Sequence, residues 1–138
     1  MPKIIFVDDE EDLEHLIVQR FAKKTATMGY ELMFALDGQA ALQKIEDHPD
    51  IDIALIDINM PKMNGIEFLR ALRSDPELSS LSVFIMTTSN DEQDKFEAYK
   101  LNVAGYVLKP LSFEKFVSAV SILSSYWKLC EHPELSNA

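Results

Sequence analysis

Residues 51–72 read IDIALIDINMPKMNGIEFLRAL, and they contain one complete unit of the fold. The first six residues are mostly apolar and too few for a helix, which indicates a buried strand that ends just before Asp57. The pairs Met60-Pro61 and Asn64-Gly65 predict a loop. Apolar side chains then recur at helical spacing over residues 66–72. This stretch therefore predicts a strand, an acid at its end, a loop and a helix.

The same alternation of a short apolar run and a helical pattern continues along the chain. Further strands are predicted at residues 4–7, 30–36, 83–86 and 105–108. The other helices are marked by side chains at helical spacing: Leu13, Leu16, Ile17 and Phe21; Ala41, Leu42 and Ile45; Phe96, Tyr99 and Lys100; Phe113, Phe116, Val117, Val120 and Leu123. Strands that are apolar on both faces and separated by helices require a parallel sheet covered on both sides. The predicted fold class is α/β: a doubly wound five-stranded parallel sheet in the flavodoxin-like order 2-1-3-4-5, with five helices on its two faces.

Three helix starts carry capping signals. Asp37 and Ser112 stand where a side chain can accept a hydrogen bond from the first turn of the second and fifth helices. Ser89 and Glu92 have the spacing of a capping box ahead of the fourth helix.

Composition bounds the class of protein. The chain has 138 residues, 47% of them hydrophobic, which fits one domain; we expect it over residues 1–128, followed by a tail at 129–138 and no output domain. A formal net charge of −10 argues against binding to nucleic acid or to an anionic membrane. The single cysteine, Cys130, excludes an internal disulfide and favours a reducing compartment. Because no stretch suits a signal peptide or a membrane span, we expect a cytoplasmic protein.

Three acids should meet at one edge of this sheet. In an open parallel sheet, ligands bind beyond the carboxyl ends of the strands where the strand order reverses, here between the first and third strands. Asp8 and Asp9 follow the first strand and Asp57 follows the third. An all-oxygen donor set of this kind suits Mg²⁺. The alternative is that Asp8 and Asp9 belong to an acidic run at a helix N-terminus, which is the simplest interpretation of residues 10–12.

The other two strand ends supply a hydroxyl and an ammonium. The fourth strand is followed by Thr87-Thr88-Ser89 and the fifth by Lys109-Pro110. Taken singly, Thr87 is an ordinary strand-end threonine and Lys109 a surface lysine. Beside the acids, however, the two groups can hold the oxygens of a phosphoryl group. Asp57 could then act as the nucleophile and form an aspartyl-phosphate.

With these residues in order, the chain resembles the response-regulator receiver domains of two-component signalling and is similar to the chemotaxis regulator. The resemblance runs from about Lys3 to Leu123. It depends on five motifs: Val7-Asp8-Asp9, Asp57-Ile58-Asn59-Met60-Pro61, Asn64-Gly65, Met86-Thr87-Thr88, and Gly105-Tyr106-Val107-Leu108-Lys109-Pro110. Residues 87–91 and Tyr126-Trp127 are similar to a stand-alone subgroup that includes phytochrome-associated response regulators.

The resemblance implies a phosphoacceptor and a metal site. Asp57 would receive a phosphoryl group from a histidine kinase or a phosphotransfer protein. Asp8, Asp9, Asp57 and the backbone carbonyl of Asn59 would hold Mg²⁺.

The resemblance also implies a switch. Lys109 would contact the phosphoryl oxygens, Thr87 would move toward them, and Tyr106 would turn inward; Thr88 is the alternative to Thr87. The site would be bordered by Thr88, Ser89 and Pro110. The Lys109–Pro110 bond is expected to be cis.

The expected function is that of a single-domain response regulator that signals by phosphorylation-dependent contact with a downstream protein. It would be a stoichiometric phosphoacceptor with slow self-dephosphorylation, not an enzyme. Two alternatives stay open: a Mg²⁺-dependent phosphohydrolase, although the DxDx[TV] signature is absent, and a receiver-like scaffold that takes no phosphate. Some members of the stand-alone subgroup dimerise, so a homodimer is the alternative to a monomer. Tyr126 and Trp127 either pack on the domain or form part of a partner face.

Overall fold

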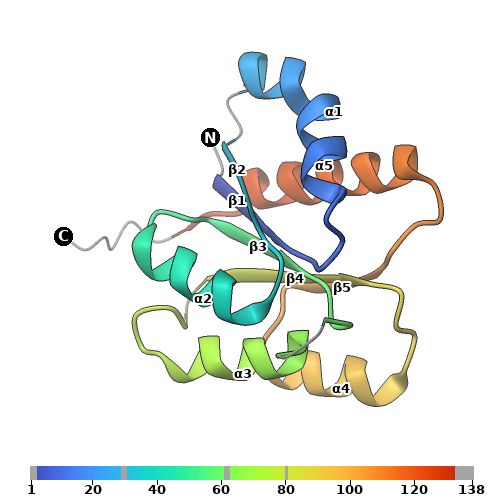
Figure 1. The fold of residues 1–138 in the computed structure, drawn as a ribbon. Coiled ribbons are helices and arrows are strands. Elements are labelled where there is room, and N and C mark those ends of the chain that lie inside the picture. The colour runs from blue at the N-terminus through green and yellow to red at the C-terminus, as the bar shows by residue number, and fades with distance from the viewer. Residues whose placement is uncertain (1–2, 29–30, 61–62, 80, 133–138) are drawn as a thin grey trace.

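The protein was analysed as a computed structural model, which describes residues 3–28, 31–60, 63–79 and 81–132, with the backbone alone over 21–28. Five strands alternate with five helices along this part of the chain (Figure 1). The strands are β1 Lys3–Val7, β2 Glu31–Ala35, β3 Ile53–Ile56, β4 Ser82–Thr87 and β5 Gly105–Leu108. The helices are α1 Leu13–Met28, α2 Gly38–Asp47, α3 Gly65–Ser74, α4 Glu92–Lys100 and α5 Phe113–Leu129.

The five strands form one sheet in the order β2-β1-β3-β4-β5, and each neighbouring pair is parallel. The predicted fold is therefore confirmed. The register of the two central strands places Val7 of β1 opposite Ile56 of β3. The next residue on each strand, Asp8 and Asp57, consequently emerges beside the other at the carboxyl edge.

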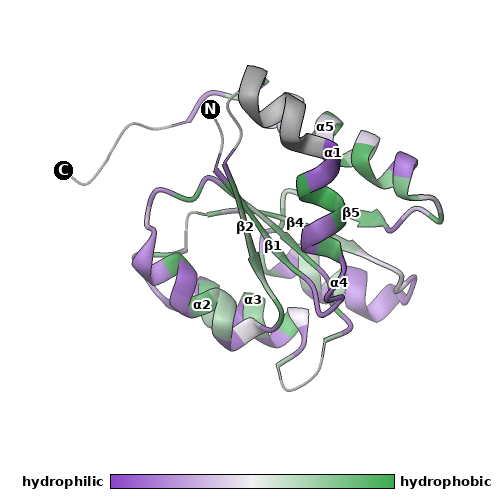
Figure 2. Ribbon diagram, turned by 45° about the horizontal axis from the view of Figure 1, so that its top comes forward, coloured by the Kyte–Doolittle hydropathy of each residue, from purple (hydrophilic) through white to green (hydrophobic). Residues whose placement is uncertain are grey.

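Helices cover both faces of the sheet, with α1 and α5 on one side and α2, α3 and α4 on the other (Figure 1). Each layer encloses a separate cluster of buried apolar side chains. The strands are largely hydrophobic, whereas α2 and α4 carry many hydrophilic residues (Figure 2), as expected when both faces of a sheet are buried. Within the described residues, none of the helices combines the length and apolarity needed to cross a membrane.

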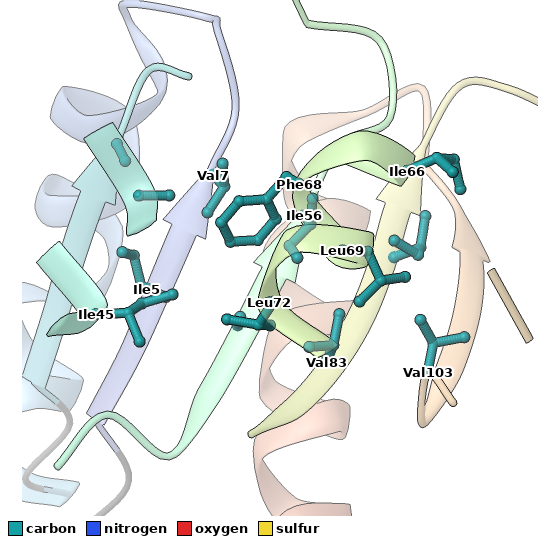
Figure 3. Close-up of a cluster of buried hydrophobic side chains, with 14 of the residues drawn as sticks. Ile5, Val7, Ile45, Ile56, Ile66, Phe68, Leu69, Leu72, Val83 and Val103 are labelled. Carbon is teal, nitrogen blue, oxygen red and sulfur yellow. The ribbon is translucent and has the colours of Figure 1, made fainter. Parts of the chain in front are cut away.

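Helix α3 is the most firmly buried of the helices that frame the site. Phe68, Leu69 and Leu72 are each 0% exposed and face the sheet beside Val7, Ile56 and Val83 (Figure 3). Burial of one such side chain contributes about 1.5–3 kcal/mol. The helix begins with a capping box that joins residues 64 and 67 at 2.9 and 3.0 Å. The capping box therefore holds the end of the 57–64 loop that joins α3.

Two of the predicted caps are confirmed and one is wrong. Asp37 accepts a hydrogen bond from Ala40 N at 2.8 Å, and Ser112 caps α5. Helix α4 is capped by Asp91, which accepts from Gln93 N at 2.7 Å, and not by the predicted pair Ser89 and Glu92. A carboxylate that already stands next to the first turn is the stronger acceptor there, since it also interacts with the helix dipole.

Some predicted side chains and boundaries differ from the structure. Leu16 is 39% exposed, because Leu13 and Ile17 form the apolar stripe of α1 that faces the sheet. The third strand begins two residues later than predicted, at Ile53. Of the second predicted strand, residue 30 lies outside the described residues, as does the side chain of Phe21.

The two late aromatic residues on α5 differ in their surroundings. Trp127 packs against the cluster between the sheet, α1 and α5, and its ring stacks on His132 at 4.1 Å between centroids. Tyr126 makes an edge contact with Phe84 yet is 53% exposed. Trp127 therefore packs on the domain, whereas Tyr126 packs on it only in part and is about half exposed to solvent.

Gly65 is expected to tolerate no side chain. A Cβ at this position would lie 2.5 Å from the carbonyl oxygen of Asp57 and 2.7 Å from the Cα of Ile58, so the backbone itself would have to shift. We expect Gly65→Ala to lower the free energy of unfolding by about 2 kcal/mol or more, as measured by urea unfolding. In Gly38→Ala the new Cβ would meet only the movable side chain of Met63, and we expect a change below about 1 kcal/mol. Equal losses in the two variants would contradict this account.

Candidate functional site

The carboxyl edge of the sheet brings together Asp8, Asp9 and Asp57. One carboxylate oxygen from each lies within 4.8 Å of the others. Asp8 and Asp57 are 8% and 6% exposed, whereas Asp9 is exposed to solvent. Their backbones are fixed by the strand ladder, since Asp57 N donates to Val7 O at 2.9 Å and Asp8 N to Ala35 O at 3.0 Å. The edge therefore carries two buried acids and one exposed acid at a set spacing.

Both oxygens of Asp8 are engaged. Oδ1 accepts from the backbone N–H of Glu10 at 3.0 Å, and Oδ2 accepts from Lys109 Nζ at 2.6 Å. Burial raises the pKa of the Asp8 carboxyl above its ordinary value, although the ammonium of Lys109 opposes that shift. The charge on Asp8 is thus costly to bury and depends on a nearby cation.

Asp57 is oriented by three donors. Its Oδ1 accepts from the Thr87 hydroxyl at 2.6 Å and from the backbone N–H of Asn59 at 3.1 Å. Its Oδ2 accepts from Lys109 Nζ at 3.2 Å. A carboxylate held in this way at the mouth of the sheet has a defined direction from which an electrophile can approach.

Lys109 extends from the end of β5 to both buried acids. Burial alone would lower the pKa of its ammonium, but the carboxylates of Asp8 and Asp57 outweigh burial and raise that pKa above the ordinary value. Lys109 therefore stays protonated at neutral pH. Its backbone N–H donates to Thr87 O at 2.7 Å, which continues the β4–β5 ladder to the edge of the site.

The expectation of a cis bond between Lys109 and Pro110 is wrong for this structure, in which the described residues contain no cis peptide bond. A bond before proline prefers the trans form by about 0.5–1 kcal/mol. The ladder bond from Lys109 N to Thr87 O is made with the peptide in that form.

The two neighbouring threonines are placed differently. Thr87 is 0% exposed and its hydroxyl lies on Asp57. Thr88 is exposed and accepts from the side-chain amide of Asn59 at 3.4 Å. The hydroxyl that reaches the acid cluster is thus that of Thr87, while Thr88 and Asn59 lie at its border.

Tyr106 lies on β5 opposite Ile85, two residues before the residue that pairs with Thr87. Its ring packs against the cluster beneath α3 and α4, and its hydroxyl donates to the carbonyl oxygen of Ser89 at 2.9 Å. Burial raises the pKa of this phenol. Sequence reasoning missed one further participant, Asp94, which accepts from the Ser89 hydroxyl at 2.6 Å. No motif signals this pair, because the path of residues 89–91 decides whether the two side chains meet.

The donor set fits a hard divalent cation. All available ligand atoms are oxygens, and their spacing allows one ion to touch carboxylates from both strands. Three carboxylates and one ammonium leave two negative charges, which one divalent ion would neutralise. Mg²⁺ and Mn²⁺ both bind oxygen ligands of this kind.

Lys109→Met tests the dependence of the acids on a cation. In EDTA we expect the free energy of unfolding to fall by roughly 1–3 kcal/mol, less than complete burial would cost, because these side chains keep some contact with water. Saturating Mg²⁺ should reduce the deficit by binding more strongly to the variant's native state. In Lys95→Met, which loses an ion pair with the exposed Glu92, the change should stay below about 1 kcal/mol. A Lys109→Met deficit that Mg²⁺ leaves unaltered would contradict this view.

Known proteins share this architecture along most of their length. Response regulator Rcp1 from Synechocystis sp. is 30% identical over 132 residues, which cover 91% of this chain and 89% of that protein. Chemotaxis protein CheY1 from Helicobacter pylori is 28% identical over 111 residues, which cover 80% of this chain and 86% of that protein. The crystal structure of the phosphorylated cyanobacterial phytochrome response regulator RcpA has a TM-score of 0.85 at 28% identity. The match covers 96% of this chain and 99% of the RcpA chain.

The crystal structure of the Mn(2+)-bound form of response regulator Rcp1 has a TM-score of 0.81 at 28% identity. The match covers 96% of this chain and 99% of the Rcp1 chain. Residues 4–121 match the model of the response regulator receiver domain. The match extends from the second residue of β1 into α5 and includes every side chain of the site. The chain therefore belongs to the response-regulator receiver domain family of two-component signalling.

Proposed function

We propose that Asp57 accepts a phosphoryl group from a histidine kinase or a phosphotransfer protein, and that this modification is a signal read by another protein. The observation that carries the proposal is the placement of Asp57. Its two oxygens are held by Thr87, Asn59 N and Lys109, and it lies beside Asp8 and Asp9. A hydroxyl and an ammonium converge on one buried carboxylate, which is what transfer of a phosphoryl group to that carboxylate requires.

In the proposed reaction, an oxygen of Asp57 forms a bond to the phosphorus of the donor while the bond from phosphorus to the donor's histidine nitrogen breaks. The nitrogen keeps the electron pair of the broken bond. Lys109 offsets negative charge on the transferred oxygens, and the Thr87 hydroxyl can donate to one of them. Asp8, Asp9, Asp57 and the backbone carbonyl of Asn59 would hold Mg²⁺, which supplies charge neutralisation when bound.

We propose a stoichiometric acceptor rather than an enzyme with turnover. Asp57 itself would be modified, and slow attack by water on the aspartyl-phosphate would reset it. Thr88, Ser89 and Pro110 would border the site and limit the approach of water.

The response to modification would be a shift between two conformations. Thr87 and Tyr106 are both hydrogen-bonded to the backbone of Ser89, so a new position of the Thr87 hydroxyl would alter the surroundings of Tyr106 on β5. We expect the altered surface to include α4, β5 and α5. A downstream protein in the cytoplasm would recognise that surface. A net charge of −10 disfavours nucleic acid or an anionic membrane as the partner.

Asp57→Asn tests the acceptor. With Mg²⁺ and a small-molecule phosphodonor such as phosphoramidate, we expect the wild type to gain one phosphoryl group by intact-mass spectrometry and the variant to gain none. The matched control is Asp52→Asn at the opposite edge of the sheet. It retains a side-chain oxygen that can accept from Lys3 N and should label fully. Undiminished labelling of Asp57→Asn would refute the proposal, and repeated turnover of phosphorylated small molecules would favour a phosphohydrolase instead.

Asp9→Asn tests the metal site with little effect on folding. Asp9 is exposed, so removal of its charge should relieve repulsion within the cluster without opening the core. We expect the affinity for Mg²⁺ to fall by about tenfold or more, as measured by calorimetry, with the free energy of unfolding in EDTA unchanged or higher. Glu11→Gln removes an equal charge nearby and should leave Mg²⁺ affinity within about twofold of the wild type. Wild-type affinity in Asp9→Asn would exclude Asp9 as a ligand.

A further inference from the structure

Ser89 and Asp94 form a hydrogen bond that lies outside the acceptor site. Ser89 Oγ donates to Asp94 Oδ2 at 2.6 Å, and both residues are partly buried. Ser89 Oγ also accepts from Asp91 N at 3.4 Å. Because Asp91 caps α4, the Ser89 hydroxyl remains available to bind Asp94 in the first turn of the helix.

This bond is of the strong kind. A distance of 2.6 Å is typical of a hydroxyl that donates to an ionised carboxylate. Asp94 lies in the first turn of α4, where a negative charge interacts favourably with the helix dipole. The backbone of Ser89 is therefore fastened to the start of α4 through its side chain.

The same residue is joined to the acceptor site through its backbone. Ser89 N donates to Thr87 Oγ1 at 3.3 Å, and Thr87 Oγ1 in turn donates to Asp57 Oδ1 at 2.6 Å. The carbonyl oxygen of Ser89 accepts from the Tyr106 hydroxyl at 2.9 Å. A continuous chain of hydrogen bonds thus runs from Asp57 through Thr87 and Ser89 to Asp94.

The other end of α4 is held in a different way. Arg73 of α3 donates from Nε to Leu101 O at 2.8 Å and from Nη2 to Asn102 O at 2.9 Å. This guanidinium holds the C-terminal end of α4 against α3, far along the helix from Asp57. A change at Thr87 would therefore act on the N-terminal end while the C-terminal end stays anchored.

We propose that the Ser89–Asp94 hydrogen bond couples the state of Asp57 to the position of the N-terminal end of α4, with Ser89 as a positioning residue. A phosphoryl group on Asp57 changes what the Thr87 hydroxyl can bind. Ser89 N shares that hydroxyl oxygen, so the displacement passes to Ser89 and, through its own hydroxyl, to α4. The bond also holds Ser89 so that Thr87 is oriented toward Asp57 before modification. This inference depends on the proposed function of Asp57.

The test compares affinities for beryllofluoride, a mimic of a phosphoryl group on a carboxylate, in the full chain with saturating Mg²⁺. We expect Ser89→Ala and Asp94→Ala each to weaken apparent binding by about fivefold or more. The double variant should show the same factor and not the product of the two, because both changes remove one bond. Ser89→Thr keeps a hydroxyl and should restore most of the affinity. On addition of the mimic, amide spectra should show shifts across α4 in the wild type that are reduced in both alanine variants.

Glu92→Ala is the matched control, since it removes an exposed carboxylate from the same helical turn that, in the described contacts, pairs only with the half-buried Lys95. It should bind the mimic within about twofold of the wild type. Amide spectra without the mimic establish whether each variant is folded. If Ser89→Ala does not fold, Asp94→Ala still tests the same hydrogen bond. Wild-type affinity in both single variants, multiplying losses in the double variant, or an equal loss in Glu92→Ala would overturn the coupling. If the wild type itself neither labels at Asp57 nor binds the mimic, the proposed function fails instead.

Discussion

The contact of one ammonium with two buried carboxylates requires three strands to end at the same edge of the sheet. Lys109 Nζ meets Asp8 Oδ2 at 2.6 Å and Asp57 Oδ2 at 3.2 Å. These groups come from the ends of β5, β1 and β3, so they meet only if the three strands run in the same direction and end at the same edge. Like charges at this spacing oppose folding unless a cation lies between them. The acid cluster therefore depends on the parallel sheet, and the sheet accommodates it because Lys109 lies between the two buried acids.

Much of this arrangement could be predicted from the sequence because two strong regularities act together. Apolar runs too short for helices, separated by helical patterns, leave few alternatives to a parallel sheet covered on both faces. The ends of the strands in such a sheet then define where Asp8, Asp57, Thr87 and Lys109 must lie, whatever the details of the loops. The family resemblance added roles to those positions, and the matched family supports the same general assignment.

What could not be predicted was decided by loop conformation and by competition between similar groups. Ser89 and Asp91 can both cap α4, and the backbone between them gives the cap to Asp91. That outcome frees the Ser89 hydroxyl for Asp94, a contact with no sequence signature. Leu16 fitted the apolar spacing of α1, but the sheet is covered there by Leu13 and Ile17. The Lys109–Pro110 bond followed from resemblance alone, and the residues themselves carried no information about its isomer.

Unequal anchoring of the helices suggests which part of the molecule can respond to Asp57. Helix α3 buries five residues, and Gly65 at its start lies too close to the backbone of residues 57–58 for any side chain. Helix α4 buries only Ala98 among its described residues, and Phe96 and Tyr99 are 59% and 53% exposed. Displacement of a helix costs roughly in proportion to the apolar area that it uncovers. A change at the acid cluster would therefore leave α3 in place and move α4, whose N-terminal end is joined to Asp57 by hydrogen bonds that can be rearranged without opening the core.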